Sequence, residues 1–191
     1  MFQTIKPALV LFALFTILTG LFYPLIITAA AQGLFAWQAN GSLVTTTDGS
    51  EIGSALIGQP FNDPQYFWGR LSATAEKPFN AAASGGSNYS VLIDALQEQV
   101  RVRIDALQAA DPGNTLPIPV DLVTASASGL DPHISPAAAY YQVARIARLR
   151  GLREEQVQAL VQEYIDAPFL GIVGEPRVNV LLLNLALDSL Q

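Results

Sequence analysis

Residues 8–36 read ALVLFALFTILTGLFYPLIITAAAQGLFA, and this stretch determines how the rest of the chain is organised. It contains fifteen Leu, Ile, Val or Phe residues, and no Asp, Glu, Lys or Arg occurs between Lys6 and Asp48. A helix of this length would be about 43 Å long, whereas the hydrocarbon core of a bilayer is about 30 Å thick. The sequence therefore predicts a short N-terminal segment, residues 1–7, one transmembrane helix, residues 8–36, and a single domain, residues 37–191.

A secretory signal peptide is the alternative interpretation of the same stretch. Lys6 precedes it, and Ala29-Ala30-Ala31 resembles an A-x-A cleavage site, which would produce a mature chain starting at Gln32. The apolar core of a signal peptide is only about 7–15 residues long, whereas this one extends to the alanines and resumes at Gly33-Leu34-Phe35. The length favours an anchor that is not cleaved.

The positions of the basic residues predict the direction of this anchor. Lys6 and the terminal amine precede the span, and the next Lys or Arg is Arg70. Because basic residues are enriched on the cytoplasmic side of a span, the N-terminus is predicted inside the cell and the domain outside it. Pro24 lies within the span, where proline kinks a helix and usually needs a neighbouring helix to cover the freed carbonyl. A lone anchor that simply tolerates Pro24 is the alternative.

The composition of the domain excludes several classes of function. Removing Lys6 leaves nine Lys and Arg against sixteen Asp and Glu residues, a formal charge of −7. An acidic surface is a poor partner for nucleic acid. The chain has no cysteine and one histidine, so neither disulfides nor a conventional zinc site is expected.

The pattern of the domain predicts the α+β class, with about three helices and short strands. Residues 38–90 are rich in turn formers, and their aromatic cluster Tyr66-Phe67-Trp68 is expected to supply either strand or core anchors. Ser90 is predicted to cap a helix over residues 91–110, with Val91 and Leu107 at the two ends of its apolar face. Ser135 and Gly151 are predicted to begin and end a helix over residues 136–150. The remaining expectations are an extended segment over 121–128, a helix near 153–166, and a buried helix after Glu175-Pro176, with a strand over 178–183 as the alternative.

A membrane-anchored Ser/His/Asp hydrolase is the alternative function that the residues suggest. His133 follows Asp131 closely and lies near Ser126 and Ser128 in the sequence. No G-x-S-x-G motif accompanies them, and triads are recognised by geometry rather than by nearness in sequence. The competing interpretation is a turn at Asp131-Pro132 and a helix cap at Ser135.

The absent motifs are more informative. The span carries no acidic or basic residue to bind an ion, and the chain has neither a phosphorylatable Asp-Lys-Thr-Gly motif nor a TVGYG-like filter. Such a chain is not expected to pump or conduct ions on its own.

Six segments, in order along nearly the whole chain, resemble the C subunit of the bacterial Kdp potassium-transporting ATPase. One departure is Leu71, where the family usually has proline after Gly-Arg. The segments are Trp37–Leu43 (WQANGSL), Gly53–Gln59 (GSALIGQ), Gly69–Thr74 (GRLSAT), Ser84–Asn88 (SGGSN), Leu122–Asp131 (LVTASASGLD) and Asn184–Asp188 (NLALD).

The resemblance implies an accessory, non-catalytic subunit in the bacterial inner membrane. Its implied partners are a channel-like potassium-binding subunit, a P-type catalytic subunit and a small single-helix subunit, with ATP and potassium handled by the complex. The implied roles are assistance in assembly and an increase in the ATP affinity of the catalytic subunit. Ser84, Gly85, Gly86, Ser87 and Asn88 resemble the signature loop of ABC transporters, and the resemblance makes them the candidate nucleotide contact. That role conflicts with the predicted topology, which places these residues outside the cell.

Overall fold

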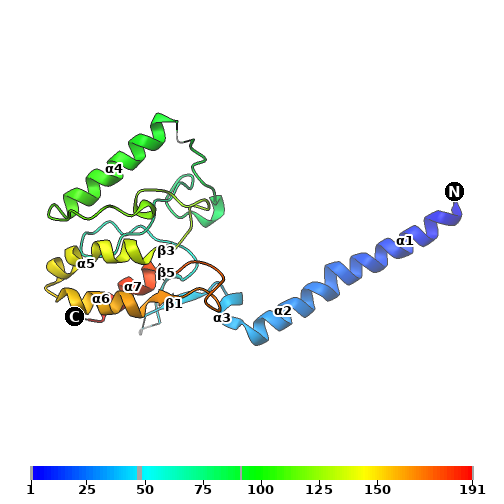
Figure 1. The fold of residues 1–191 in the computed structure, drawn as a ribbon. Coiled ribbons are helices and arrows are strands. Elements are labelled where there is room, and N and C mark those ends of the chain that lie inside the picture. The colour runs from blue at the N-terminus through cyan, green and yellow to red at the C-terminus, as the bar shows by residue number, and fades with distance from the viewer. Residues whose placement is uncertain (1, 47–48, 91, 191) are drawn as a thin grey trace. The chain divides into compact units, whose positions relative to one another are not determined.

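The computed structural model describes residues 2–46, 49–90 and 92–190 and divides the chain into two units, Met1–Ile52 and Gly53–Gln191. A long N-terminal helix makes up most of the first unit, and several helices with short strands make up the second (Figure 1). The predicted α+β class, with one apolar helix before a domain, is therefore confirmed.

The first unit contains the predicted apolar helix. Its residues Thr4–Leu34 are long and apolar enough to cross a membrane, and none of them is buried against other parts of the protein. The helix begins before residue 8, the first residue of the predicted range, and ends at Leu34, two residues before the end of that range. Its consecutive elements are α1 (Phe2–Ile17), the π-helix η1 (Leu18–Phe22) and α2 (Tyr23–Leu34), followed by the short helix α3 (Ala36–Ala39) and a two-stranded sheet of β1 (Leu43–Thr45) and β2 (Glu51–Ser54).

The described residues of the second unit form four α-helices, two short 3-10 helices and a three-stranded antiparallel sheet of order β3-β5-β4. In the central strand, Val178 pairs with Ile134 on one side and with Ile165 on the other. The elements are η2 (Ala81–Ala83), α4 (Asp94–Ala110), η3 (Val120–Leu122), β3 (His133–Ile134), α5 (Pro136–Arg150), α6 (Glu154–Glu163), β4 (Ile165–Asp166), β5 (Arg177–Asn179) and α7 (Val180–Asp188).

Helix α5 forms as the sequence predicts. The Ser135 hydroxyl accepts a hydrogen bond from the Ala138 amide at 3.1 Å, and Pro136 occupies the first turn, where its missing N–H costs nothing. Gly151 ends the helix with φ +67°, a left-handed conformation that favours glycine. Three arginines near the end of the helix make individual contacts with side chains or backbone carbonyls, so they do more than complement the helix dipole.

Two other sequence predictions are wrong. Ser90 does not cap α4, because its hydroxyl accepts the Leu92 amide in a local turn and the helix begins at Asp94; Val91 lies outside the described residues. Residues 121–128 do not form a strand. They pass through η3, Thr124 bonds back to the Val120 carbonyl at 2.8 Å, and only Ala125 makes an isolated bridge, to Leu71. Local bonds of this kind compete with a strand ladder.

The helix predicted near 153–166 ends early. It stops at Glu163, since Ile165 and Asp166 pair with β5 instead. Both interpretations of the last segment are partly confirmed, because residues 177–179 form a strand and Asn179 caps the buried helix α7 that follows.

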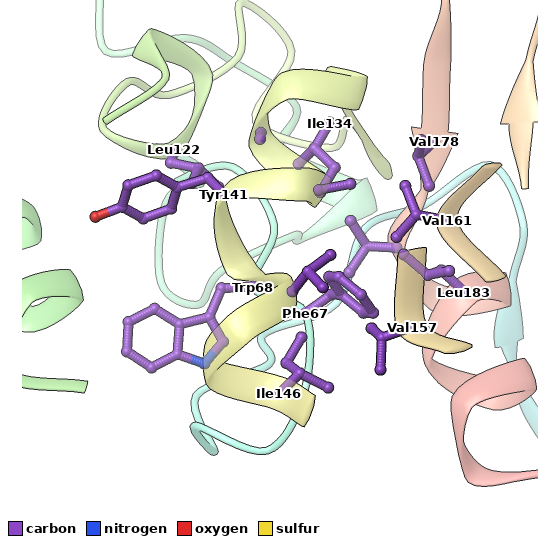
Figure 2. Close-up of a cluster of buried hydrophobic side chains, with 14 of the residues drawn as sticks. Phe67, Trp68, Leu122, Ile134, Tyr141, Ile146, Val157, Val161, Val178 and Leu183 are labelled. Carbon is purple, nitrogen blue, oxygen red and sulfur yellow. The ribbon is translucent and has the colours of Figure 1, made fainter. Parts of the chain in front are cut away.

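The core of the domain lies between α5, α6, α7 and the sheet. Figure 2 shows the ring of Phe67 among aliphatic side chains from these elements, with Trp68 at one side of the cluster. Of the two roles predicted for the aromatic cluster, that of core anchor is therefore confirmed for Phe67 and Trp68, which are buried. The fully buried aliphatic members include Leu122, Ile134, Ile146, Val157, Val161, Val178, Leu183 and Leu187.

Buried side chains supply the backbone bonds of the segment that carries these aromatic residues. Asn184 of α7 accepts from the Phe67 amide at 2.8 Å and donates to the Phe67 carbonyl at 3.0 Å. Gln142 of α5 does the same for Trp68, at 2.8 and 3.1 Å. Because unpaired backbone groups in a core are costly, these two amides allow an irregular segment to pass between helices.

Candidate functional site

The loop Ser84–Asn88 lies against the segment Ala127–Gly129 of the same domain. The Ser84 hydroxyl donates to the Ser128 carbonyl at 3.0 Å, and the Gly85 amide donates to the same oxygen at 2.9 Å. A Cβ on Gly86 would lie 2.8 Å from the Ala127 carbonyl oxygen, so the close approach requires glycine. The loop is thus a fitted part of the domain surface rather than a free phosphate-binding turn.

A hollow of about 420 Å³ borders this loop. Its lining includes Gly86 and Ser87 together with Thr74, Tyr89 and Gln99, and none of the described residues that line it is Lys or Arg. Its volume lies within the range of small-molecule sites. Its chemistry suits neutral hydrogen-bonding groups better than phosphates, which proteins usually hold with cationic side chains.

A second hollow, of about 650 Å³, lies over β3 and the start of α5. Arg70 reaches Asp131 across it at 3.2 Å, and His133 Nδ1 lies 3.3 Å from the other oxygen of that carboxylate. Burial of Asp131 opposes ionisation, but the bonds from the His133 side chain and amide and the charge of Arg70 outweigh it, so the pKa of this carboxyl lies below its ordinary value. The charged groups here stabilise one another.

The residues of the hydrolase alternative are not assembled into a triad. Asp131 does contact His133, but the hydrogen bonds of the described residues include none between His133 and a serine. The Ser128 hydroxyl accepts the Leu130 amide, and the Ser135 hydroxyl serves Asp121 and the helix cap. Ser135 at the helix start agrees with the competing interpretation. The structure therefore does not favour the hydrolase.

The apolar helix has a local feature at the predicted proline position. Pro24 is the second residue of α2, directly after the π-helix Leu18–Phe22, in which the Tyr23 amide bonds to the Leu18 carbonyl. Proline cannot donate the next helical hydrogen bond, and the wider π turn accommodates it. Thr16 and Thr19 donate to the Phe12 and Phe15 carbonyls at 2.7 Å, which satisfies both hydroxyls within the helix.

The described residues hold no group of three or more His, Asp or Glu side chains arranged to bind a metal. Sequence reasoning missed the Arg70–Asp131 pair, whose members are 61 residues apart, and the support of the Ser84–Asn88 loop by Ser128. Spacing along the chain carries no signal for either contact. The described residues thus form an anchor and a packed domain, and neither of the two hollows described above contains an assembled catalytic group among these residues.

Comparison with known proteins gives one consistent result. The family model described as KdpC, the K+-transporting ATPase c chain, matches residues 5–189. Three similar proteins, each named potassium-transporting ATPase KdpC subunit, cover almost all of both chains. They come from Variovorax paradoxus (65% identity, covering 98% of this chain and 96% of the relative), Herpetosiphon aurantiacus (61%, 97% and 96%) and Methylococcus capsulatus (58%, 100% and 100%).

Proposed function

Because the chain belongs to the KdpC family, that of the K+-transporting ATPase c chain, we propose that it is an accessory, non-catalytic subunit of an ATP-driven, high-affinity potassium uptake complex. The observation that carries this proposal is the membrane helix. Thr4–Leu34 contains one charged residue, Lys6, near its start. Ion-moving segments need polar or ionisable groups within the membrane, so potassium is moved by other subunits.

The proposed partners are the channel-like potassium-binding subunit, the P-type catalytic subunit, the small single-helix subunit and membrane lipid. The N-terminus lies in the cytoplasm and the domain lies outside the inner membrane, where it covers the external potassium entrance. The position of Lys6 before the span supports this orientation. The helix stabilises the assembly by packing against the membrane part of the pump.

Pro24 is proposed as the docking position of that helix. The π turn before it changes which residues face one side of the helix, and Pro24 itself has no N–H to donate to a carbonyl of the preceding turn. Such carbonyls are stabilised by a neighbouring helix in a bilayer. Pro24→Leu should therefore reduce the amount of the other subunits that co-purify with the chain, whereas Leu25→Ile, one position along, should not.

The chain is also proposed to raise the ATP affinity of the catalytic subunit. Two routes to this effect differ in the side of the membrane on which the loop lies. In the first route the Ser84–Asn88 loop contacts nucleotide directly, and the adjoining hollow of about 420 Å³ supports this route. In the second route the loop stays outside and the membrane helix transmits the effect to the catalytic subunit. The cation-free lining of the hollow supports the second route.

One labelling experiment separates the two routes and tests the orientation. The chain contains no cysteine, so Ser87→Cys creates a unique thiol beside the hollow. We expect a membrane-impermeant maleimide to label it on intact cells, and Gln3→Cys, at the N-terminus, to react only after the cells are opened. Labelling of residue 87 only in opened cells would reverse the orientation and support direct nucleotide contact.

A further inference from the structure

The turn between β4 and β5, residues 167–174, exposes four large apolar side chains. We call it the apolar turn. Their exposed fractions are 70% for Phe169, 78% for Leu170, 82% for Ile172 and 61% for Val173. No charged residue occurs between Asp166 and Glu175. Four such side chains within five residues form a contiguous patch, and exposed patches of this kind mark contact sites.

The backbone of the apolar turn forms hydrogen bonds within itself. Phe169 and Val173 exchange two bonds, of 2.9 and 3.0 Å, and the Gly171 amide donates to the Pro168 carbonyl at 2.9 Å. At its base, Arg177 pairs with Asp166 at 2.8 Å. Because unpaired backbone groups are what make a loop costly in a nonpolar medium, this turn can place its side chains there at a reduced cost.

The strand that follows the apolar turn is bonded to the first residues of the second unit. Strand β5 begins three residues after the turn, at Arg177, and extends about 7 Å to Asn179. The Asn179 side chain donates to the Ala55 carbonyl at 2.8 Å, and Ala55 is the third residue of the second unit. The strand that leaves the turn is therefore fixed to the N-terminal end of the second unit.

These properties fit lipid better than a protein surface. A specific protein interface uses about 800 Å² and 20–30 residues on each side, with hydrogen bonds at a polar rim. The apolar turn is one short segment without a polar side chain between Ala167 and Gly174. Insertion into a membrane interface needs only apolar area, and the anchor already holds the chain at a bilayer.

We propose that Phe169, Leu170, Ile172 and Val173 insert into the interface of the bilayer that holds the anchor. The domain then has two points of attachment, the covalent connection and the apolar turn, and its orientation over the membrane is restricted. This contact does not depend on which side of the membrane the domain occupies, so its test is independent of the proposed orientation.

The absence of cysteine makes a direct test possible. Ile172→Cys in the full chain is labelled with an environment-sensitive fluorophore, and the chain is reconstituted into phosphatidylcholine nanodiscs, alone and in the assembled complex. Gln108→Cys, exposed on α4, is the matched control. We expect lipids with a quencher on the acyl chain to lower the emission at residue 172 by about twofold or more and to leave residue 108 unchanged.

A second variant tests whether the apolar side chains drive the insertion. Phe169→Ser combined with Leu170→Ser should abolish lipid quenching of the label at residue 172 and make it accessible to iodide in water. Iodide quenching without lipid quenching in the parent chain, both alone and in the complex, would overturn the proposal. Protection from both quenchers only in the complex would assign the turn to a protein partner and would equally overturn it.

Discussion

Asn184 places a side-chain amide in an apolar core, where it stabilises the fold by forming hydrogen bonds with two backbone groups. Both the amide and the carbonyl of Phe67 bond to it, and the residue itself is buried. A leucine at this position would fill a similar volume and leave both groups unpaired. The loss is therefore one of hydrogen bonding rather than of packing.

Asn184→Leu should destabilise the domain by about 3 kcal/mol, since a buried backbone group without a partner costs about 1–3 kcal/mol. The measurement is thermal unfolding of the full chain in detergent, followed by circular dichroism. Gln108→Leu likewise replaces a side-chain amide by leucine, on the exposed surface of α4, and should have little effect. Equal losses of stability in the two variants would contradict the stabilising role of the Asn184 hydrogen bonds.

Asp131 should make part of the stability of the domain dependent on pH. Its pKa is lowered in the folded protein, since the bonds from His133 and the charge of Arg70 outweigh its burial. A group of this kind stabilises the fold above its unfolded pKa of about 3.9, and that contribution is lost as the pH falls through the folded pKa. Asp131→Asn should therefore unfold at a lower temperature than the parent at pH 6, and the difference should shrink towards pH 3.

The control for this pH dependence is Asp105→Asn, exposed on α4. Unfolding temperatures of the three chains are compared at several pH values between pH 3 and pH 6. A constant difference between Asp131→Asn and the parent over that range would show that the carboxylate does not act through its ionisation.

Among the elements, α5 and α4 show why one helix boundary could be predicted and the other could not. Residues 135–151 contain their own start and stop signals, namely Ser135, Pro136 and Gly151, and the helix forms between them. Ser90 carries the same chemistry but forms a local turn, and α4 starts four residues later. Two local structures compete for one serine hydroxyl, and the sequence does not rank them.

The glycine after α5 is needed for its backbone angle alone. Gly151 has φ +67°, and no heavy atom lies within 4 Å of the position that a Cβ would occupy, so the space would accept a methyl group. Gly151→Ala should destabilise the domain by about 1 kcal/mol because alanine disfavours this conformation. Gly113, after α4, has equal space without a positive φ, and Gly113→Ala should be neutral or slightly stabilising. Thermal unfolding compares the two, and equal destabilisation would point to another cause.

The short strands and the candidate sites follow from contacts between distant residues. Ile165 lies within the range predicted as a helix, yet it pairs with Val178, and this tertiary pairing ends α6 at Glu163. The Ser84–Asn88 loop could be singled out by its glycines and by resemblance, but its support by Ser128, 44 residues away, could not. The anchor was predictable because a span depends only on length and apolar composition.

At the scale of the whole molecule, the main electrostatic property is the acidic charge of residues 37–191. The formal charge is −7, and many of its carboxylates are exposed. On the proposed location over the external potassium entrance, such a domain would raise the local concentration of cations. The effect acts over a Debye length, about 10 Å at 0.1 M salt and about 30 Å at 0.01 M, so it is testable only at low ionic strength.

Neutralising three exposed carboxylates should raise the apparent KM for potassium of the assembled complex about twofold at an ionic strength of about 0.01 M and leave it unchanged at about 0.15 M. The reason is that a smaller negative charge attracts fewer cations to the entrance, while kcat, which the proposed function assigns to other subunits, stays constant. The measurement is potassium-stimulated ATP hydrolysis as a function of potassium concentration. The three substitutions are Glu98→Gln, Asp105→Asn and Glu155→Gln, and a control variant replaces the exposed glutamines Gln97, Gln108 and Gln158 with alanine. If the KM for potassium of the substituted complex stays constant at low salt, the charge serves solubility alone. If the control variant changes this KM equally, the shape of the surface rather than its charge is responsible.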